Sequence, residues 1–208
     1  MFAQFRSFAK LFAKGQTVSV PLYMTLLNLN DDATVALREI RSAIRGSPHL
    51  QDEVIALFEN PNWRPQLVGG VALLLGAATP TTLDALWRAV DAGSWASPQL
   101  VGVASTVDTQ FVSHAMERII ARCPIVAERL DRMPWPERHS AAGPESIIQH
   151  SAKLFAALVG VVELSQERPD WLTQELAKSD AQALLATDQG GSRSLAPKWR
   201  SAWSKLQG

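Results

Sequence analysis

Residues whose types and spacing could support chemistry are few and scattered in this chain of 208 residues. His114 and Glu117 lie three positions apart, so a helix would present both on one face, as half of a metal site. A di-metal bundle would also need Glu-x-x-His pairs on other helices, and the sequence contains none. We therefore interpret His114 and Glu117 as part of a polar helix face, and we expect no metal or other cofactor.

Other candidates for catalysis are equally isolated. Cys123 is the only cysteine, which rules out a disulfide within the chain and fits a reducing compartment. No neighbouring residues give it the geometry of a nucleophile, so we expect a buried, inert thiol. Glu163 and Glu167 lie four apart on a predicted helix, where they could pair for acid–base work or form a solvated acidic face. Glycine-rich phosphate loops are absent, and we predict no catalytic residues and no enzymatic activity.

The composition favours a globular domain and argues against a nucleic-acid-binding, secreted or membrane-spanning protein. An apolar share of 47% and a charged share of 19% suit a globular domain with a substantial core. The 20 basic and 20 acidic residues cancel, which argues against general affinity for nucleic acid, because such binders need a basic excess. The N-terminus lacks the apolar segment of a secretory signal, and no apolar window approaches the roughly 20 residues that span a bilayer. We expect a cytoplasmic protein.

Prolines indicate where the positioning elements begin. Proline is tolerated in the first turn of a helix, and nine of the 12 prolines stand before a stretch that is compatible with one. Stripes with the 3.6-residue period follow several of them, as at 83–90, and strand-like alternation is nearly absent. The sequence therefore predicts an all-α fold. The nine prolines are Pro21, Pro48, Pro65, Pro80, Pro98, Pro124, Pro144, Pro169 and Pro197.

Part of the chain is repeated. The run Pro-Gln-Leu-Val-Gly occurs at 65–69 and again at 98–102, 33 residues later, and Trp63 and Trp95 precede the two copies. An apolar helix stands before each copy, so the unit is a helix, a turn with a tryptophan, and a helix headed by proline. The glycine that ends each run is small enough to let neighbouring helices approach closely.

This unit resembles the helix pairs of HEAT-like α-helical repeat proteins over roughly residues 48–122, in architecture and not in a signature. The resemblance implies an α-solenoid, a right-handed stack of antiparallel helix pairs that usually holds other macromolecules on a concave surface. A minority, the HEAT-like DNA glycosylases, are enzymes with a basic groove that contains an aromatic residue and a carboxylate. Asp91 with Trp95, or Asp84 with Trp87, would supply such a pair here.

The ends of the chain carry two amphipathic segments. We predict one domain over 1–208, with a capping helix at 1–20, helix-pair repeats at 21–122 and a C-terminal helical part at 123–208. Residues 2–14 set four phenylalanines against three basic residues, a pattern that suits either a cap on the stack or an anionic membrane surface. We favour the cap. A second capping helix is predicted near the C-terminus, with an apolar stripe of Leu195, Trp199, Trp203 and Leu206.

Two segments are candidates for binding a partner. The connector at 132–139 combines stiffening prolines with residue types that are common at interface hot spots, although its tryptophan could equally fill the core. Acidic residues accumulate after position 162, which suits docking of a basic partner or a solvated face. The predicted binding residues are Trp135, Arg138, His139, Glu163, Glu167 and Asp170.

Together these features favour a non-catalytic protein-binding module. Its concrete form would be an inhibitor or immunity-type protein that acts on one bacterial toxin or enzyme. A nucleic-acid enzyme of the HEAT-like glycosylase type and a peripheral membrane adaptor that uses residues 2–14 remain as alternatives.

Overall fold

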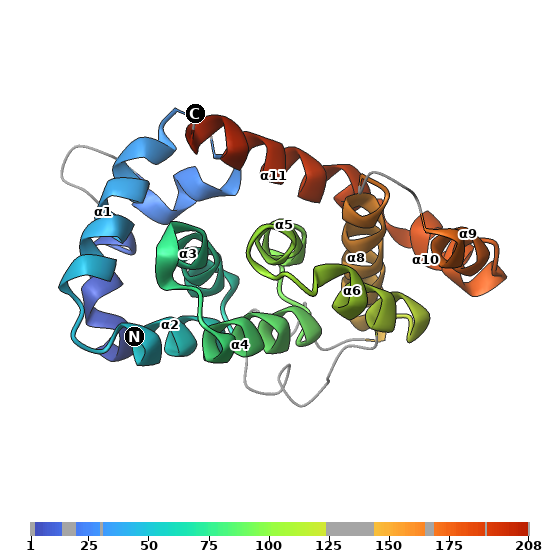
Figure 1. Ribbon diagram of the computed structural model, residues 1–208, viewed down its shortest axis with the longest axis horizontal. Helices are drawn as coiled ribbons and strands as arrows, with labels where there is room; N and C mark the ends of the chain where they lie inside the picture. The colour runs from blue at the N-terminus through green and yellow to red at the C-terminus, as the bar shows by residue number, and fades with distance from the viewer. Residues whose placement is uncertain are drawn as a thin grey trace.

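The computed structural model describes residues 3–13, 20–29, 31–123, 144–164, 169–189 and 191–207, and these residues form helices and connecting turns without any strand (Figure 1). The predicted all-α fold class is thereby confirmed. None of the helices described is both long and apolar enough to cross a membrane. The elements are η1 (Ala3–Leu11), η2 (Leu22–Leu27), α1 (Ala33–Gly46), α2 (Leu50–Glu59), α3 (Trp63–Ala72), η3 (Leu73–Ala77), α4 (Pro80–Asp91), α5 (Ser97–Val107), α6 (Phe111–Ile120), α8 (Pro144–Val162), α9 (Asp170–Leu176), α10 (Ser179–Thr187) and α11 (Ser192–Gln207).

The two repeated helices, α3 and α5, form the centre of the molecule. They pack on each other, with α2 and α4 along one side and with η2 and α11 along the other (Figure 1). Every residue from 65 to 72 and from 97 to 104 is buried. Because a helix that is apolar on all sides must be covered on all sides, these sequences require neighbours around their whole circumference.

Local signals in the sequence account for most helix starts. Pro65, Pro80 and Pro98 lie in the first turns of α3, α4 and α5. In α4 the Thr79 hydroxyl and Thr82 form a reciprocal capping box, which satisfies two N–H groups that the first turn leaves without partners. Pro21 and Pro169 stand at the N-cap positions of η2 and α9, and Pro124 lies outside the described residues.

Pro197 is an exception to the rule that prolines mark helix starts. It lies inside α11, which begins five residues earlier at Ser192. Proline has no N–H, so the Arg193 carbonyl lacks its usual donor one turn later in the helix. That carbonyl faces Gly160 of α8, and a Cβ atom at position 160 would overlap its oxygen. The proline thus lies in the helix interior, and the carbonyl that it leaves without a donor is the one packed against Gly160 of α8.

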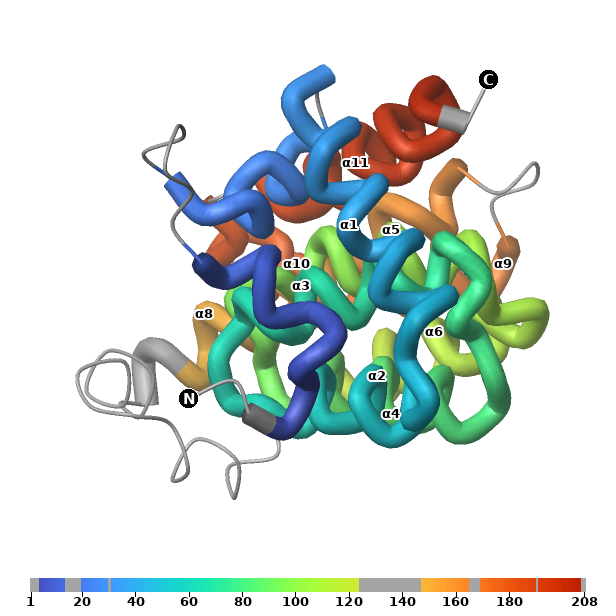
Figure 2. Tube along the Cα trace, turned by 90° about the vertical axis from the view of Figure 1, so that its left-hand side faces the viewer, coloured from blue at the N-terminus to red at the C-terminus, as the bar shows by residue number. Residues whose placement is uncertain are grey.

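The terminal segments both pack on the rest of the protein, in different ways. The first is a 3-10 helix, η1, interrupted at Phe5, and it lies on α1 and α2 with Phe5 and Phe8 buried (Figures 1 and 2). The last, α11, is predicted to cap one end of the stack. In the structure it crosses over α5 and α8. The Trp199 indole N–H donates to the Leu26 carbonyl in η2 at 3.0 Å, which joins α11 to the N-terminal part. The far end is formed instead by α9 and α10 (Figure 1).

The contact between Gly160 and Arg193 makes a testable prediction. Gly160→Ala should lower the free energy of unfolding by about 3 kcal/mol, because the added methyl group overpacks two helices that cannot separate freely. Gly46→Ala is the matched control, since a Cβ there meets no atom within 4 Å. Urea unfolding followed by circular dichroism measures both variants. Equal stability of the two would show that α8 and α11 do not approach as closely as described.

Candidate functional site

Of the six residues predicted to bind a partner, the structure describes two, Glu163 and Asp170. Trp135, Arg138, His139 and Glu167 lie outside the described residues. Asp170 is exposed in the first turn of α9, and Glu163 follows the last turn of α8. Their part in binding stays a prediction.

Three of the late acidic residues, Glu163, Glu175 and Asp180, pair with arginines inside the protein. Glu163 accepts a hydrogen bond at 2.8 Å from Nε of Arg193 in α11. Glu175 and Asp180 both pair with Arg122, which follows α6. These cations are 30 or more positions away in the sequence, so counting charges along the chain cannot reveal them. The cluster is therefore a weaker candidate for docking a basic partner than its composition suggests.

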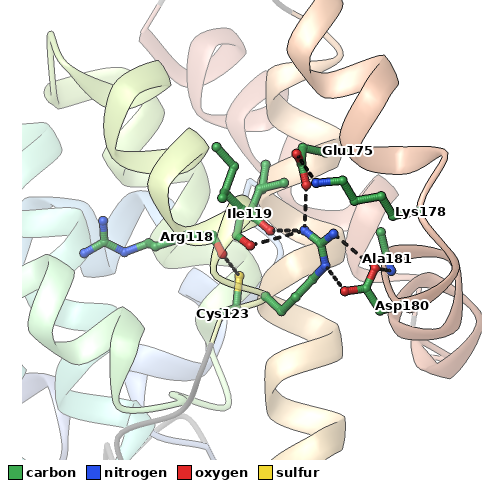
Figure 3. A network of polar contacts seen from close by, with 9 residues as sticks. Arg118, Ile119, Cys123, Glu175, Lys178, Asp180 and Ala181 are labelled. Atoms are coloured by element: carbon green, nitrogen blue, oxygen red, sulfur yellow. Dashed lines mark hydrogen bonds and ion pairs between the residues drawn. The ribbon is translucent and has the colours of Figure 1, made fainter.

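Arg122 is the centre of a network that joins α9 and α10 to α6. Figure 3 shows Ile119, Glu175, Lys178 and Asp180 of this network. Its guanidinium donates to Asp180 at 2.9 and 3.1 Å and to Glu175 at 3.1 Å, and it also donates to the Ile119 carbonyl at 2.7 Å. Lys178 and Arg122 together hold the pKa of Glu175 below its ordinary value, and Arg122 does the same for the pKa of Asp180. The network is a structural clamp, because Arg122, which follows α6, bonds to a carboxylate of α9 and to one of α10.

Cys123 lies beside this clamp and has the properties of an inert thiol (Figure 3). It is 1% exposed, and its Sγ donates to the Arg118 carbonyl at 3.4 Å. Burial, reinforced by the negative charge of Asp91, raises the pKa of Cys123 to about 12. Since the thiolate is the reactive form, this cysteine is unsuited to nucleophilic catalysis.

Asp108 joins α4, the α5–α6 turn and α6. Its carboxylate accepts from the Trp87 indole N–H at 2.8 Å and from the Gln110 backbone N–H at 2.8 Å, and it contacts His114 Nδ1 at 2.7 Å. Burial alone would raise the pKa of Asp108, but the hydrogen bonds from His114, Gln110 and Trp87 outweigh it and lower the pKa. An aspartate that orients a histidine also occurs in catalytic triads. Here the same carboxylate holds three parts of the fold together.

Two members of the carboxylate–tryptophan pairs expected of a glycosylase-like site have other hydrogen-bond partners. Trp87 bonds to Asp108, and Asp91 accepts two hydrogen bonds, at 2.6 and 2.7 Å, from Arg118. The Arg118 guanidinium also lies 4.1 Å from the Trp87 ring centroid. Within the described part of the chain, no group of three or more His, Cys, Asp or Glu side chains is arranged to hold a metal ion.

A ladder of aromatic rings provides the strongest candidate for binding. From the N-terminal segment to the repeats, successive ring centroids are 5.5 to 6.0 Å apart. The ladder starts in the buried core and ends on the surface at Trp95, which is 56% exposed. Its members in order are Phe5, Phe12, Tyr23, Trp63 and Trp95.

The repeat explains why the last two rings differ in exposure. Trp63 is the first residue of α3, two positions before Pro65, and is partly buried. Trp95 stands three positions before Pro98, because the second copy has one extra residue, and it lies in the turn before α5 begins. The extra residue thus moves Trp95 out of the helix and onto the surface. Lys153 of α8 places its Nζ 5.4 Å from the Trp95 ring centroid. We name Trp63, Trp95 and Lys153 the tryptophan surface; the sequence signal for it was the repeated tryptophan itself.

Comparisons with known proteins place no constraint on this surface. A scan against protein-family models finds no match, and searches of curated proteins and of solved structures find none either.

The lowered pKa of Asp108 predicts a pH dependence of stability. A carboxyl whose pKa is depressed by folding stabilises the protein above its ordinary pKa of about 3.9, and this contribution is lost as the pH falls through the folded-state value. Asp108→Asn should therefore lower the free energy of unfolding at pH 7 by about 2 kcal/mol and reduce the loss on acidification. Asp84→Asn, at an exposed position of α4, is the control. Parallel acid-unfolding curves for wild type and Asp108→Asn would contradict the assignment.

Burial of Cys123 predicts slow thiol chemistry in the native protein. A disulfide reagent such as dithionitrobenzoate at pH 8 should label Cys123 only as fast as the protein opens. Labelling should become rapid in denaturant, when the thiol regains an ordinary pKa of about 8.5. Rapid stoichiometric labelling without denaturant would show that the thiol is accessible.

Proposed function

We propose that the chain is a non-catalytic protein-binding module and that the tryptophan surface is its binding site. The observation that carries the proposal is the exposure of Trp95, the most exposed aromatic side chain in the described part of the chain. A tryptophan buries about 200 Å² when covered, so covering the exposed part of this ring would stabilise a complex by about 3 kcal/mol. Tryptophan is also the residue type most enriched at interface hot spots.

The support beneath Trp95 favours binding. Trp63 lies 5.6 Å away, centroid to centroid, and Tyr23 contacts Trp63 edge to face at 6.0 Å. The Arg64 side chain donates to the Tyr23 hydroxyl at 3.0 Å, and its guanidinium lies 5.0 Å from the Trp63 centroid. A ring held by such neighbours loses little conformational entropy on binding, so more of the contact energy is retained as affinity.

The two alternative functions have less support. A membrane adaptor using residues 2–14 would have to withdraw Phe5 and Phe8 from the core, where they are 0% and 1% exposed. A glycosylase-like enzyme would need a carboxylate beside an aromatic ring in a basic groove, whereas Asp91 and Asp108 are occupied by Arg118 and by Trp87 with His114.

The HEAT-like stack and the inhibitor role remain parts of the proposal. Contacts of α2 with α4 and of α3 with α5 are those expected of successive repeats. An inhibitor or immunity-type protein would use such a rigid helical body to present one preformed surface to one partner.

Substitution of Trp95 tests the proposed function. Trp95→Ala should weaken binding of the native partner about 30-fold or more, the effect of losing a hot spot of 2 kcal/mol. Val35→Ala, which shortens a side chain 48% exposed on α1, is the matched control. The measurement compares the stoichiometric partner recovered by each immobilised variant from native lysate, followed by titration with that partner once purified. Equal affinity of Trp95→Ala and wild type would exclude this surface.

A further inference from the structure

The tryptophan surface carries a positive charge that has no ionic partner among the described residues. Lys153 of α8 places its Nζ 5.4 Å from the Trp95 ring centroid. No carboxylate of the described residues pairs with it, whereas other basic residues do form ion pairs, among them Lys10, Arg88, Arg118, Arg122, Lys178 and Arg193. The residue is partly buried, and its ammonium group lies over the Trp95 ring in a cation–π contact.

We propose that the tryptophan surface binds an acidic, extended segment of a protein partner. In this segment a carboxylate meets Lys153, and an apolar side chain two positions away covers Trp95. The inference rests on the proposed function and specifies the chemistry of its partner.

The spacing of the two groups fits this occupant. In an extended chain, side chains two positions apart point to the same face and lie about 6.6 Å apart. That distance is close to the 5.4 Å between Lys153 Nζ and the Trp95 centroid. One strand-like segment can therefore place a carboxylate and an apolar group on both at once.

Charge complementarity favours an acidic segment over a neutral one. A carboxylate that approaches Lys153 forms a charge-assisted hydrogen bond, which is roughly twice as strong as one between neutral groups. Once a partner covers Trp95, water is excluded from the space beside Lys153. The hydrogen bond between its ammonium group and a carboxylate is then stronger than it would be in water. A neutral segment that covered Trp95 would offer the ammonium group no such hydrogen bond.

A single-stranded nucleic acid offers the same two elements, a negative charge and a flat ring. The balance of 20 basic and 20 acidic residues makes it the less favoured occupant, because phosphate binding draws its strength from many cations. It is included in the test as a competing outcome.

Selection from a random peptide-display library on the full chain tests the proposal, with Trp95→Ala used for counter-selection. We expect enriched peptides that combine Glu or Asp with an apolar residue two positions away. A synthetic copy should bind wild type about tenfold more tightly than its Glu-to-Gln counterpart. Lys153→Glu should lose about tenfold in affinity for it and regain binding to a copy with Lys in place of Glu. Lys198→Glu, at an exposed position of α11, is the charge-matched control and should bind like wild type.

Other results separate the two claims. Enriched peptides that need Trp95 but bind equally well with Gln in place of Glu would overturn the acidic preference and leave the proposed function standing. An oligothymidylate that binds through Trp95 more tightly than any enriched peptide would overturn the acidic-peptide proposal in favour of nucleic acid. A selection that yields no Trp95-dependent peptide would count against both.

Discussion

Close packing at four glycines is the constraint on which the arrangement of the helices depends. Gly69 of α3, which ends the first repeated run, faces Phe58 and Leu57 of α2. Gly70 of α3 faces Leu100 and Val103 of α5, Gly102 of α5 faces the Trp199 ring, and Gly160 of α8 faces a carbonyl of α11. Protein interiors are packed too densely to absorb an added methyl group at such contacts. These glycines therefore set the distances among α2, α3, α5, α8 and α11.

The candidate binding surface follows from this packing. With α3 and α5 held side by side, the turns that precede them are also neighbours, and Trp63 contacts Trp95 although 32 residues separate them. Trp95 lies in the turn before α5, 56% exposed and next to Lys153, so the repeat that builds the core also supplies the proposed binding group.

Local features of the structure were predictable from the sequence, and long-range ones were not. The helical fold and the starts of α3, α4 and α5 near Pro65, Pro80 and Pro98 follow from patterns within a few residues. The partners of Glu163 and Glu175 are Arg193 and Arg122, which only the tertiary fold brings close. The sequence also did not predict that α11 crosses α5, because the apolar stripe of α11 suits a helix that caps the end of a stack as well as one that covers its side.

The central claim is that Trp95 is the point at which the protein meets its partner. Hydroxyl-radical footprinting of the chain, free and in complex with its native partner, tests this at single residues. The account predicts that oxidation of Trp95 falls strongly in the complex, while oxidation of Leu164, which is 60% exposed in the free chain, is unchanged. Undiminished oxidation of Trp95 in a saturated complex would contradict it.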